Sequence, residues 1–140
     1  MFFNNPEEFE SFLKPVGGDT NIRPVKGSSF NAEICMKRLN RVGLFSISAN
    51  SFKVIKEPQQ DFFGLTIPLS SPFTTKESGK DQSYYSKSAH MLLPGHSFNL
   101  SAHKNCHFLA ISFFINPIND YSNKLLQSDE IGRASCRERV

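Results

Sequence analysis

Apolar and polar side chains alternate in short runs between residues 28 and 115. In the first run the apolar side chains take every second position, at Phe30, Ala32, Ile34 and Met36. A repeat of two residues places successive side chains on opposite faces of a strand, so such runs predict half-buried strands. We expect eight of them, at residues 30–36, 45–49, 52–55, 63–69, 73–76, 84–91, 98–102 and 108–115.

Two of these strands carry further information about their place in a sheet. Pro68 interrupts the run 63–69, and because proline donates no hydrogen bond it predicts an edge strand or a bulge. The run 108–115 is apolar almost throughout, which is typical of a central strand covered on both faces. Short strands separated by turn signals predict a mainly β protein, folded as a sandwich, a β-barrel or a jelly roll. A barrel of about eight strands is either filled by side chains or holds one small ligand.

The first segment of the chain follows a helical period instead. Asn5 and Pro6 mark its start, because Asn caps helices well and Pro suits the first turn. Apolar side chains then share one face of the helix, at Phe9, Phe12 and Leu13. We predict a helix over residues 6–13 that ends before a proline at position 15, followed by a loop over residues 15–27.

A second helix signal follows the last strand. Asn116-Pro117 repeats the pairing of a cap with a proline. Behind it, apolar side chains recur at helical spacing, at Ile118, Tyr121, Leu125 and Leu126. This stripe predicts an amphipathic helix, and we take Ile118, Tyr121 and Leu125 as candidate dimerisation residues.

These patterns divide the chain into four segments. Residues 1–27 hold the first helix and a lead-in loop, residues 28–115 form the barrel, and residues 116–129 begin a linker or dimerisation helix. Residues 130–140 show no hydrophobic periodicity, and a back-translation of them matches a common sequencing adaptor. We expect the natural reading frame to depart from this sequence near Asp129 and the natural protein to continue; the alternative is a genuine basic tail.

The composition excludes several classes of protein. The 140 residues are 39% hydrophobic and 21% charged, which is ordinary for one globular domain. A formal net charge of +3 is too weak to indicate nucleic-acid binding, and no apolar run approaches the roughly 20 residues of a membrane span. The N-terminus lacks the basic start and apolar stretch of a secretory signal. Three cysteines without a paired framework favour reduced thiols, so we expect a cytoplasmic protein.

Four histidines suggest a metal site at first, but their spacing argues against one. His103 and His107 are four residues apart, and in a strand that spacing separates two side chains by about 13 Å, too far for one ion. The sequence has no His-x-His pair of the kind that metal-binding cupins use. We therefore expect no metal and no other cofactor.

Signals of catalysis and of direct DNA binding are equally weak. Cys106 and His107 are neighbours, and neighbouring strand residues point to opposite faces. The sequence has no Gly-x-Ser-x-Gly elbow, so we do not expect an enzyme. A basic cluster at Lys37, Arg38 and Arg41 fits the solvated end of a hairpin better than a phosphate contact, because no helix is predicted between residues 28 and 115 that could enter a groove.

A set of soft motifs, in order along the chain, carries a family resemblance. They are the helix at 5–13, Ser29-Phe30-Asn31-Ala32-Glu33, Arg41-Val42-Gly43-Leu44, the strand 63–69, the polar hairpin at 74–82, Met91-Leu92-Leu93-Pro94-Gly95-His96, the run 106–113 and the Asn116-Pro117 helix start. Over residues 5–126 the chain resembles the N-terminal, cupin-like regulatory domain of AraC-type bacterial transcription regulators.

The resemblance implies a fold and a function. It implies a cytoplasmic dimer in which a small-molecule effector binds inside a β-barrel and helices after the barrel pair the subunits. Promoter DNA is bound in this family by a C-terminal pair of helix-turn-helix units. Only one helix pattern follows residue 116, so DNA binding is implied for a longer protein and not for this chain.

The inward positions of the barrel are the candidates for contact with the effector. From the expected phase of the strands these candidates are Phe45, Phe63, Leu65, Ile67 and Phe98, with Tyr85 or His90 as a polar contact. The alternative for each residue is that it simply fills the core. For the chain as a whole, the alternatives are a cupin-like small-molecule- or carbohydrate-binding protein or enzyme that acts alone, and a structural interaction module.

Overall fold

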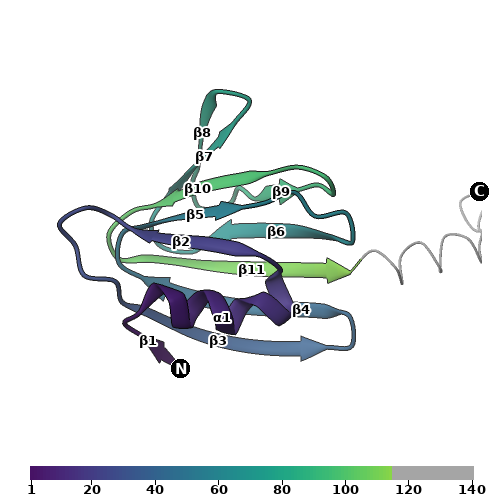
Figure 1. Cartoon of the computed structure of the whole chain (residues 1–140). Helices are drawn as coiled ribbons and strands as arrows, with labels where there is room; N and C mark the ends of the chain where they lie inside the picture. Colours follow the sequence, from purple (N-terminus) through teal and green to yellow (C-terminus); the bar gives the residue numbers. More distant parts are fainter. Residues whose placement is uncertain (115–140) are drawn as a thin grey trace, which may run out of the picture.

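A computed structural model describes residues 1–114 of the chain, and these residues form a pair of antiparallel sheets and one helix around a single core (Figure 1). One sheet has the strand order β1-β3-β4-β11-β6-β9, and the other has the order β2-β5-β10-β7-β8. The elements are β1 (Phe2–Phe3), α1 (Pro6–Gly17), β2 (Thr20–Pro24), β3 (Ala32–Leu39), β4 (Val42–Ala49), β5 (Phe52–Lys56), β6 (Phe62–Pro68), β7 (Phe73–Glu77), β8 (Lys80–Tyr84), β9 (His90–Leu92), β10 (Phe98–Ala102) and β11 (Cys106–Phe114). The prediction of a mainly β, barrel-like fold is confirmed.

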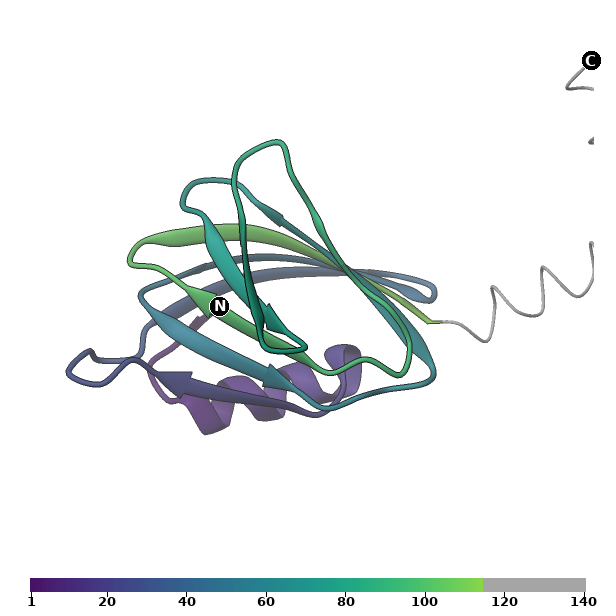
Figure 2. The ribbon, with the colours of Figure 1, turned by 90° about the horizontal axis from the view of Figure 1, so that it is seen from above.

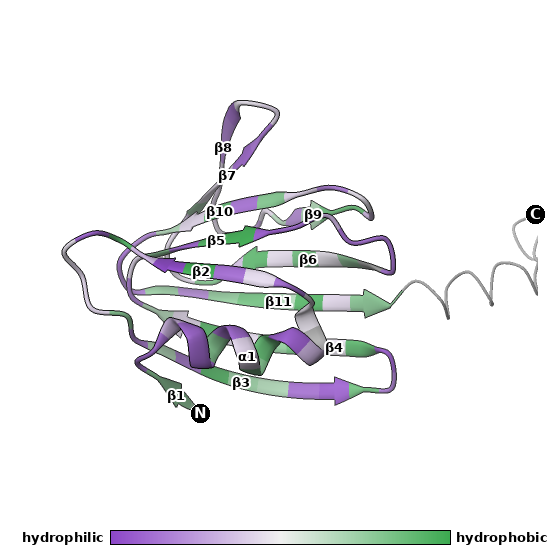
Figure 3. Ribbon diagram, in the orientation of Figure 1, coloured by the Kyte–Doolittle hydropathy of each residue, from purple (hydrophilic) through white to green (hydrophobic). Residues whose placement is uncertain are grey.

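The two sheets face each other around a shared interior (Figure 2). Alternate residues of their strands point inward, and Ile34, Phe52, Phe73 and Leu100 are almost fully buried. Figure 3 shows the same alternation as bands of apolar and polar colour along the strands. Burial of this apolar surface is the main force that holds the sheets together.

A chain of phenylalanine contacts links the helix to both sheets. Phe3 of β1 lies 5.2 Å from Phe9 of α1, and Phe9 lies 5.7 Å from Phe30, measured between ring centroids. Phe30 meets Phe52 of β5 edge to face at 6.2 Å, and Phe52 stacks on Phe108 of β11 at 6.2 Å. Such ring pairs contribute beyond their buried area, so the high phenylalanine content serves the packing of the core.

Helix α1 is capped as predicted but is longer than predicted. The Asn5 side chain accepts a hydrogen bond from the Glu7 backbone N–H at 2.8 Å, and Pro6 takes the first position. The helix continues through Pro15 to Gly17, so the predicted end at residue 13 is wrong. Pro15 is tolerated because the carbonyl that loses its partner belongs to Ser11, which is exposed and can bind water.

The predicted loop over residues 15–27 is also wrong. Thr20–Pro24 forms β2, an edge strand that pairs with β5 from Thr20 opposite Lys56 to Pro24 opposite Phe52. One apolar side chain, Ile22, points inward and is buried. A five-residue strand with one buried side chain has no readable alternation, so only its pairing partner reveals it.

The predicted strand over residues 84–91 is divided in two. β8 ends at Tyr84 and β9 begins at His90, and the two strands belong to different sheets. A turn separates them, in which Lys87 has a φ of 73° and the Ser88 hydroxyl donates to the Tyr85 carbonyl at 2.6 Å. The polar hairpin at 74–82 is present: β7 and β8 pair antiparallel around Ser78 and Gly79, which both have positive φ, as a tight hairpin turn requires.

β11 is a central strand as predicted, between β4 and β6. Its outer side chains are only half-buried among the described residues, so residues 1–114 supply the predicted cover on the inner face alone. β6 is not an edge strand either, because it lies between β11 and β9. Pro68 is its last residue, beyond the final β9 partner, Thr66, so its missing N–H breaks no bond to β9.

Candidate ligand-binding cavity

A cavity of about 110 Å³ lies between the two sheets and α1. Its walls come from α1, from β2, β5 and β10 of one sheet, and from β4, β6, β9 and β11 of the other. The lining residues are Phe9, Leu13, Gly17, Thr20, Ile22, Phe45, Ile47, Phe52, Val54, Lys56, Gly64, Leu65, Thr66, Leu92, Phe98, Leu100, Phe108, Ala110, Ile111 and Ser112. A mainly apolar hollow with a few polar groups is typical of small-molecule sites.

Phe45 reaches the cavity because Gly43 leaves room for its ring. Both residues lie on the inner face of β4, and Gly43 pairs with Ser112. A Cβ at position 43 would come within 2.9 Å of the Phe45 ring, which is closer than van der Waals contact allows. Glycine at this position therefore lets the ring fold back along its own strand.

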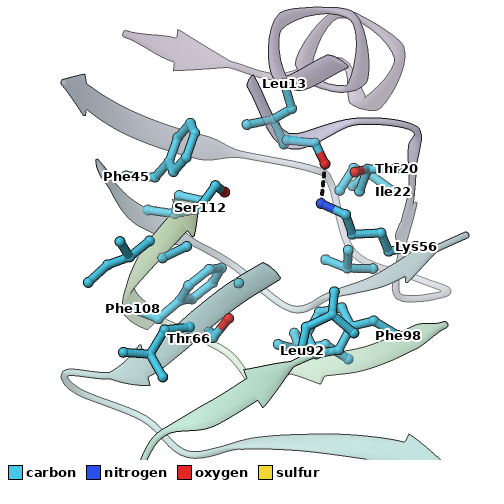
Figure 4. Close-up of a pocket in the computed structure, with 18 of the residues that line it drawn as sticks. Leu13, Thr20, Ile22, Phe45, Lys56, Thr66, Leu92, Phe98, Phe108 and Ser112 are labelled. Carbon is cyan, nitrogen blue, oxygen red and sulfur yellow. Dashed lines mark hydrogen bonds between the residues drawn. The ribbon is translucent and has the colours of Figure 1, made fainter. Parts of the chain in front are cut away.

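Lys56 brings a charge to this apolar wall. It is the last residue of β5, and the inward phase of that strand, Phe52, Val54 and Lys56, carries its side chain into the interior. The side chain is only 9% exposed, and its ammonium donates to the backbone carbonyl of Gly17 at the end of α1 (Figure 4). A cation is favourable there because the C-terminal end of a helix carries partial negative charge.

Burial lowers the pKa of Lys56 to about 8, since the charged form loses its hydration. The negative charge of Asp61 acts in the opposite direction and keeps the pKa from falling further. At pH 7 the amine is therefore still mostly protonated. The cavity contains a cation at the end of a helix in surroundings that solvate it poorly.

Three hydroxyl groups complete the polar portion of the lining. Thr20 donates to the carbonyl of Gly18 at 3.2 Å, and Thr20 is the β2 residue opposite Lys56 in the sheet. Thr66 and Ser112 lie on the other wall, on the inner faces of β6 and β11 (Figure 4). Hydroxyls can both donate and accept hydrogen bonds, so these groups can orient a polar ligand atom.

Three of the predicted contact residues line the cavity, and two of them, Phe45 and Phe98, do so from inward positions. Phe45 and Phe98 are both buried, at 2% and 8% exposure, and both belong to its wall. Phe45 comes from β4 and Phe98 from β10 in the facing sheet. The structure therefore brings these two residues together from segments more than fifty positions apart.

The predicted inward phase of β6 is wrong. In its pairing with β11, Thr66 lies opposite Ala110 and Gly64 opposite Ser112, and these positions face the cavity. The side chains of Phe63, Leu65 and Ile67 therefore lie on the outer face. Leu65 still borders the cavity, but Phe63 stacks on Phe113 outside, at 4.6 Å between centroids.

Neither polar candidate lines the cavity. Tyr85 lies in the turn after β8 and is 62% exposed. His90 is buried, and its ring lies between Tyr84 at 5.2 Å and Phe98 at 4.9 Å. Its Nε2 is 2.5 Å from Glu77 Oε1, and its Nδ1 has no hydrogen-bond partner within residues 1–114. His90 thus packs beside the cavity, behind Phe98, without touching it.

The outer face of the six-stranded sheet carries a second apolar surface, which we call the outer stripe. It consists of Val42, Leu44, Phe63, Leu65, Ile67, Met91, Leu109, Ile111 and Phe113. Met91 is 56% exposed and the others are half-buried, with Leu65 and Ile111 also bordering the cavity. The dimerisation candidates Ile118, Tyr121 and Leu125 lie outside the described residues, which end on β11 within this stripe.

The remaining chemistry signals do not gather into a second site. No group of three potential metal ligands occurs in residues 1–114. Cys106 is buried on the inner face, where burial raises the pKa of its thiol to about 11, while His107 points outward and contacts the Ser46 hydroxyl at 2.8 Å. Arg38, one of the three cluster residues, lies at the exposed end of the β3–β4 hairpin, 5.9 Å from the Phe114 ring.

Comparison with solved structures gives the fold class. The AraC-like transcriptional activator CuxR superimposes with a TM-score of 0.67 at 12% identity, over 85% of this chain and 46% of CuxR. The Schizosaccharomyces pombe Cnp3 cupin domain gives 0.51 at 6% identity, over 67% of this chain and 71% of that domain. The fold is cupin-like.

The same fold occurs in a further class of regulator. An HTH_3 family transcriptional regulator from Vibrio cholerae gives a TM-score of 0.51 at 9% identity, over 59% of this chain and 50% of that protein. No family model and no curated protein matches the sequence. The chain spans about half the length of CuxR. Within the described residues, no helix is both long and apolar enough to cross a membrane.

Proposed function

We propose that this chain is the effector-binding and dimerisation domain of an AraC-type transcription regulator in the bacterial cytoplasm. In this proposal a small molecule occupies the cavity, and its binding energy shifts the balance between two arrangements of the barrel and the segment that follows it. Promoter DNA is bound by helix-turn-helix units of a longer protein. The domain binds its effector without chemical change.

One observation carries the proposal: an apolar cavity with a charged group lies inside a cupin-like barrel. The superposition on CuxR supports the regulatory assignment, because it covers 85% of this chain. The wall supplies shape and a few polar atoms, as a binding site needs. Among the lining residues, Lys56 carries the charged group, and no paired acid and base of a catalytic site accompany it.

The test compares two neighbouring positions on β11. Ala110 faces the cavity and Leu109 faces out, so Ala110→Phe fills the cavity while Leu109→Phe adds similar bulk outside. We expect a ligand found by thermal-shift screening of small acids, sugars and aromatics to bind the wild type and Leu109→Phe, and to bind Ala110→Phe at least tenfold more weakly. Equal binding to both variants would refute the cavity as the effector site.

The dimerisation role in the proposal rests on the sequence pattern of residues 116–126 and on the outer stripe, because β11 leads from that stripe into the segment. We expect Ile118→Asp with Leu125→Asp to weaken self-association of the 140-residue chain, since charges in an apolar interface are costly. Asn119→Asp with Ser122→Asp adds the same charge at polar positions and serves as the control. Sedimentation equilibrium measures both, and equal weakening would contradict the assignment.

A further inference from the structure

The position of Lys56 indicates what kind of molecule the cavity takes. We propose that the ligand is a small monocarboxylate, whose carboxylate binds the Lys56 ammonium and whose compact apolar body lies against Phe45 and Phe108. This inference rests on the proposed function, since it names the ligand class of the same cavity.

The cation lies at one side of the cavity, and Phe45 and Phe108 lie across from it (Figure 4). Figure 4 shows Lys56, Thr20 and Ile22 on one side, and Phe45, Ser112 and Phe108 across from them. Lys56 lies between Thr20 of β2 and Phe98 of β10 in the five-stranded sheet. A molecule with an anionic end directed at Lys56 and an apolar body that extends toward Phe45 and Phe108 fits this arrangement.

The electrostatics favour an anion over a neutral molecule. A buried ammonium is costly because protein atoms solvate it less well than water does, and the lowered pKa of Lys56 reflects this cost. A carboxylate forms a charge-assisted hydrogen bond with an ammonium, which is shorter and stronger than a neutral one. A neutral ligand of the same shape would lack this charge assistance and form only the weaker hydrogen bond.

The size of the cavity limits the apolar body of the ligand. An engineered apolar cavity of roughly 150 Å³ holds benzene, and the volume here is about 110 Å³. The apolar body is therefore smaller than benzene, with roughly four or five carbon atoms. The aromatic and aliphatic lining gives such a body dispersion contacts on several sides.

The competing explanation is that Lys56 only caps α1 through the Gly17 carbonyl. The two roles are compatible, because an ammonium can donate three hydrogen bonds. They differ in one consequence: a carboxylate-binding Lys56 makes a charged ligand bind more tightly than a neutral one, whereas a lysine that only caps the helix does not. Charge preference is therefore the quantity to measure.

The experiment uses hexanoate and hexanamide, which have the same carbon chain and differ in charge. Calorimetric titration of the 140-residue protein measures both affinities in the wild type, in Lys56→Met and in Lys53→Met. Lys53 is exposed on the same strand, so its substitution removes an equal charge outside the cavity. We expect hexanoate to bind the wild type and Lys53→Met at least tenfold more tightly than hexanamide, and Lys56→Met to lose this preference.

The other outcomes overturn the inference in distinct ways. Equal binding of hexanamide and hexanoate to the wild type would reject the anion preference, and this comparison needs no variant to fold. If Ala110→Phe then abolished the binding of both compounds, the cavity would remain the effector site. A preference that survives in Lys56→Met would place the carboxylate elsewhere. Binding of neither probe would reject this ligand class, while the comparison of Ala110→Phe with Leu109→Phe still decides the proposed function independently.

Discussion

The inner and outer faces of the six-stranded sheet are both rich in apolar side chains, yet they have different environments. On the inner face, Phe45 and Phe108 are 2% and 6% exposed and meet the facing sheet. On the outer face, Leu109 and Phe113 are not covered by the facing sheet and stay half-buried. The comparison shows that apolar character alone does not identify the core side of a strand.

The difference has an energetic consequence. A side chain packed between two layers loses both its buried area and its close contacts when it is truncated, and it leaves a void. A side chain on an open face is partly hydrated in the folded state, so its truncation loses less. Neighbouring positions on one strand can therefore differ several-fold in their contribution to stability.

The largest effect is expected at Phe108, which stacks on Phe52 in the core. We expect Phe108→Ala to lower the free energy of unfolding by about 3–5 kcal/mol. Leu109→Ala, one position away on the outer face, should lower it by about 1 kcal/mol. Urea denaturation followed by circular dichroism measures both, and equal losses would contradict the assignment of the two faces.

The next effect concerns the buried charge of Lys56. Its folded pKa of about 8 lies below the ordinary value of 10.5, so the unfolded chain binds more protons between these values. Stability therefore rises with pH in this window, by about 1 kcal/mol from pH 8 to pH 9. We expect Lys56→Met to remove this rise and to be about 1–2 kcal/mol more stable than the wild type at pH 7, because the desolvation cost exceeds the lost bond to Gly17.

Ionisation of Cys106 sets the upper limit of the pH range in which the Lys56 effect can be measured. Burial raises the pKa of its thiol from 9.0 to about 11, so its contribution to stability is present below pH 9 and is lost as the pH rises through 11. The two groups therefore act in opposite directions above pH 9. Denaturation series from pH 7 to pH 9 isolate Lys56, and an unchanged rise in Lys56→Met would show that another group causes it.

An effect of similar size and opposite sign is expected at Gly43, which makes room for the Phe45 ring. We expect Gly43→Ala to lower the free energy of unfolding by about 1–2 kcal/mol, since the added Cβ would lie 2.9 Å from that ring. In a double-mutant cycle with Phe45→Leu the two losses should not add, because the shorter side chain removes the clash. Strict additivity would mean that the ring does not depend on the glycine.

The last prediction concerns chemical reactivity and leaves stability unchanged. It compares the labelling rates of two cysteine thiols in the same sheet. Cys35 is exposed on the outer face of β3, and Cys106 is 2% exposed on the inner face of β11. In a Cys136→Ser background we expect a maleimide reagent at pH 7.5 to label Cys35 at least about a hundredfold faster, because buried, protonated thiols react poorly. Mass spectrometry of peptides identifies the labelled residue, and similar rates would contradict the closed interior.

Much of the fold could be predicted from the sequence where the signal is local. Alternation located the core strands, Asn5 and Pro6 located the start of α1, and Ser78-Gly79 marked a tight turn. The inward positions of Phe45 and Phe98 followed from the same alternation, because polar or small residues separate the apolar ones there. In β6 the signal failed: Phe63, Leu65 and Ile67 are the more apolar phase, and they face outward.

Other features depend on contacts between distant segments and leave no local pattern. β2 exists because β5 pairs with it, and the apparent strand 84–91 divides because its two ends join different sheets. Lys56 follows Phe52 and Val54 at a spacing of two, and this alternation could have predicted its inward position. The Gly17 carbonyl that accepts its hydrogen bond lies 39 positions earlier, so that contact leaves no local pattern.

The sequence by itself therefore determined the class of the fold, since the period of apolar residues is a property of neighbouring positions. The tertiary structure decided which apolar face encloses the cavity and which side chains meet within it. The physical reason is that a sheet face becomes an interior only when a second layer covers it. That layer comes from segments far away in the chain.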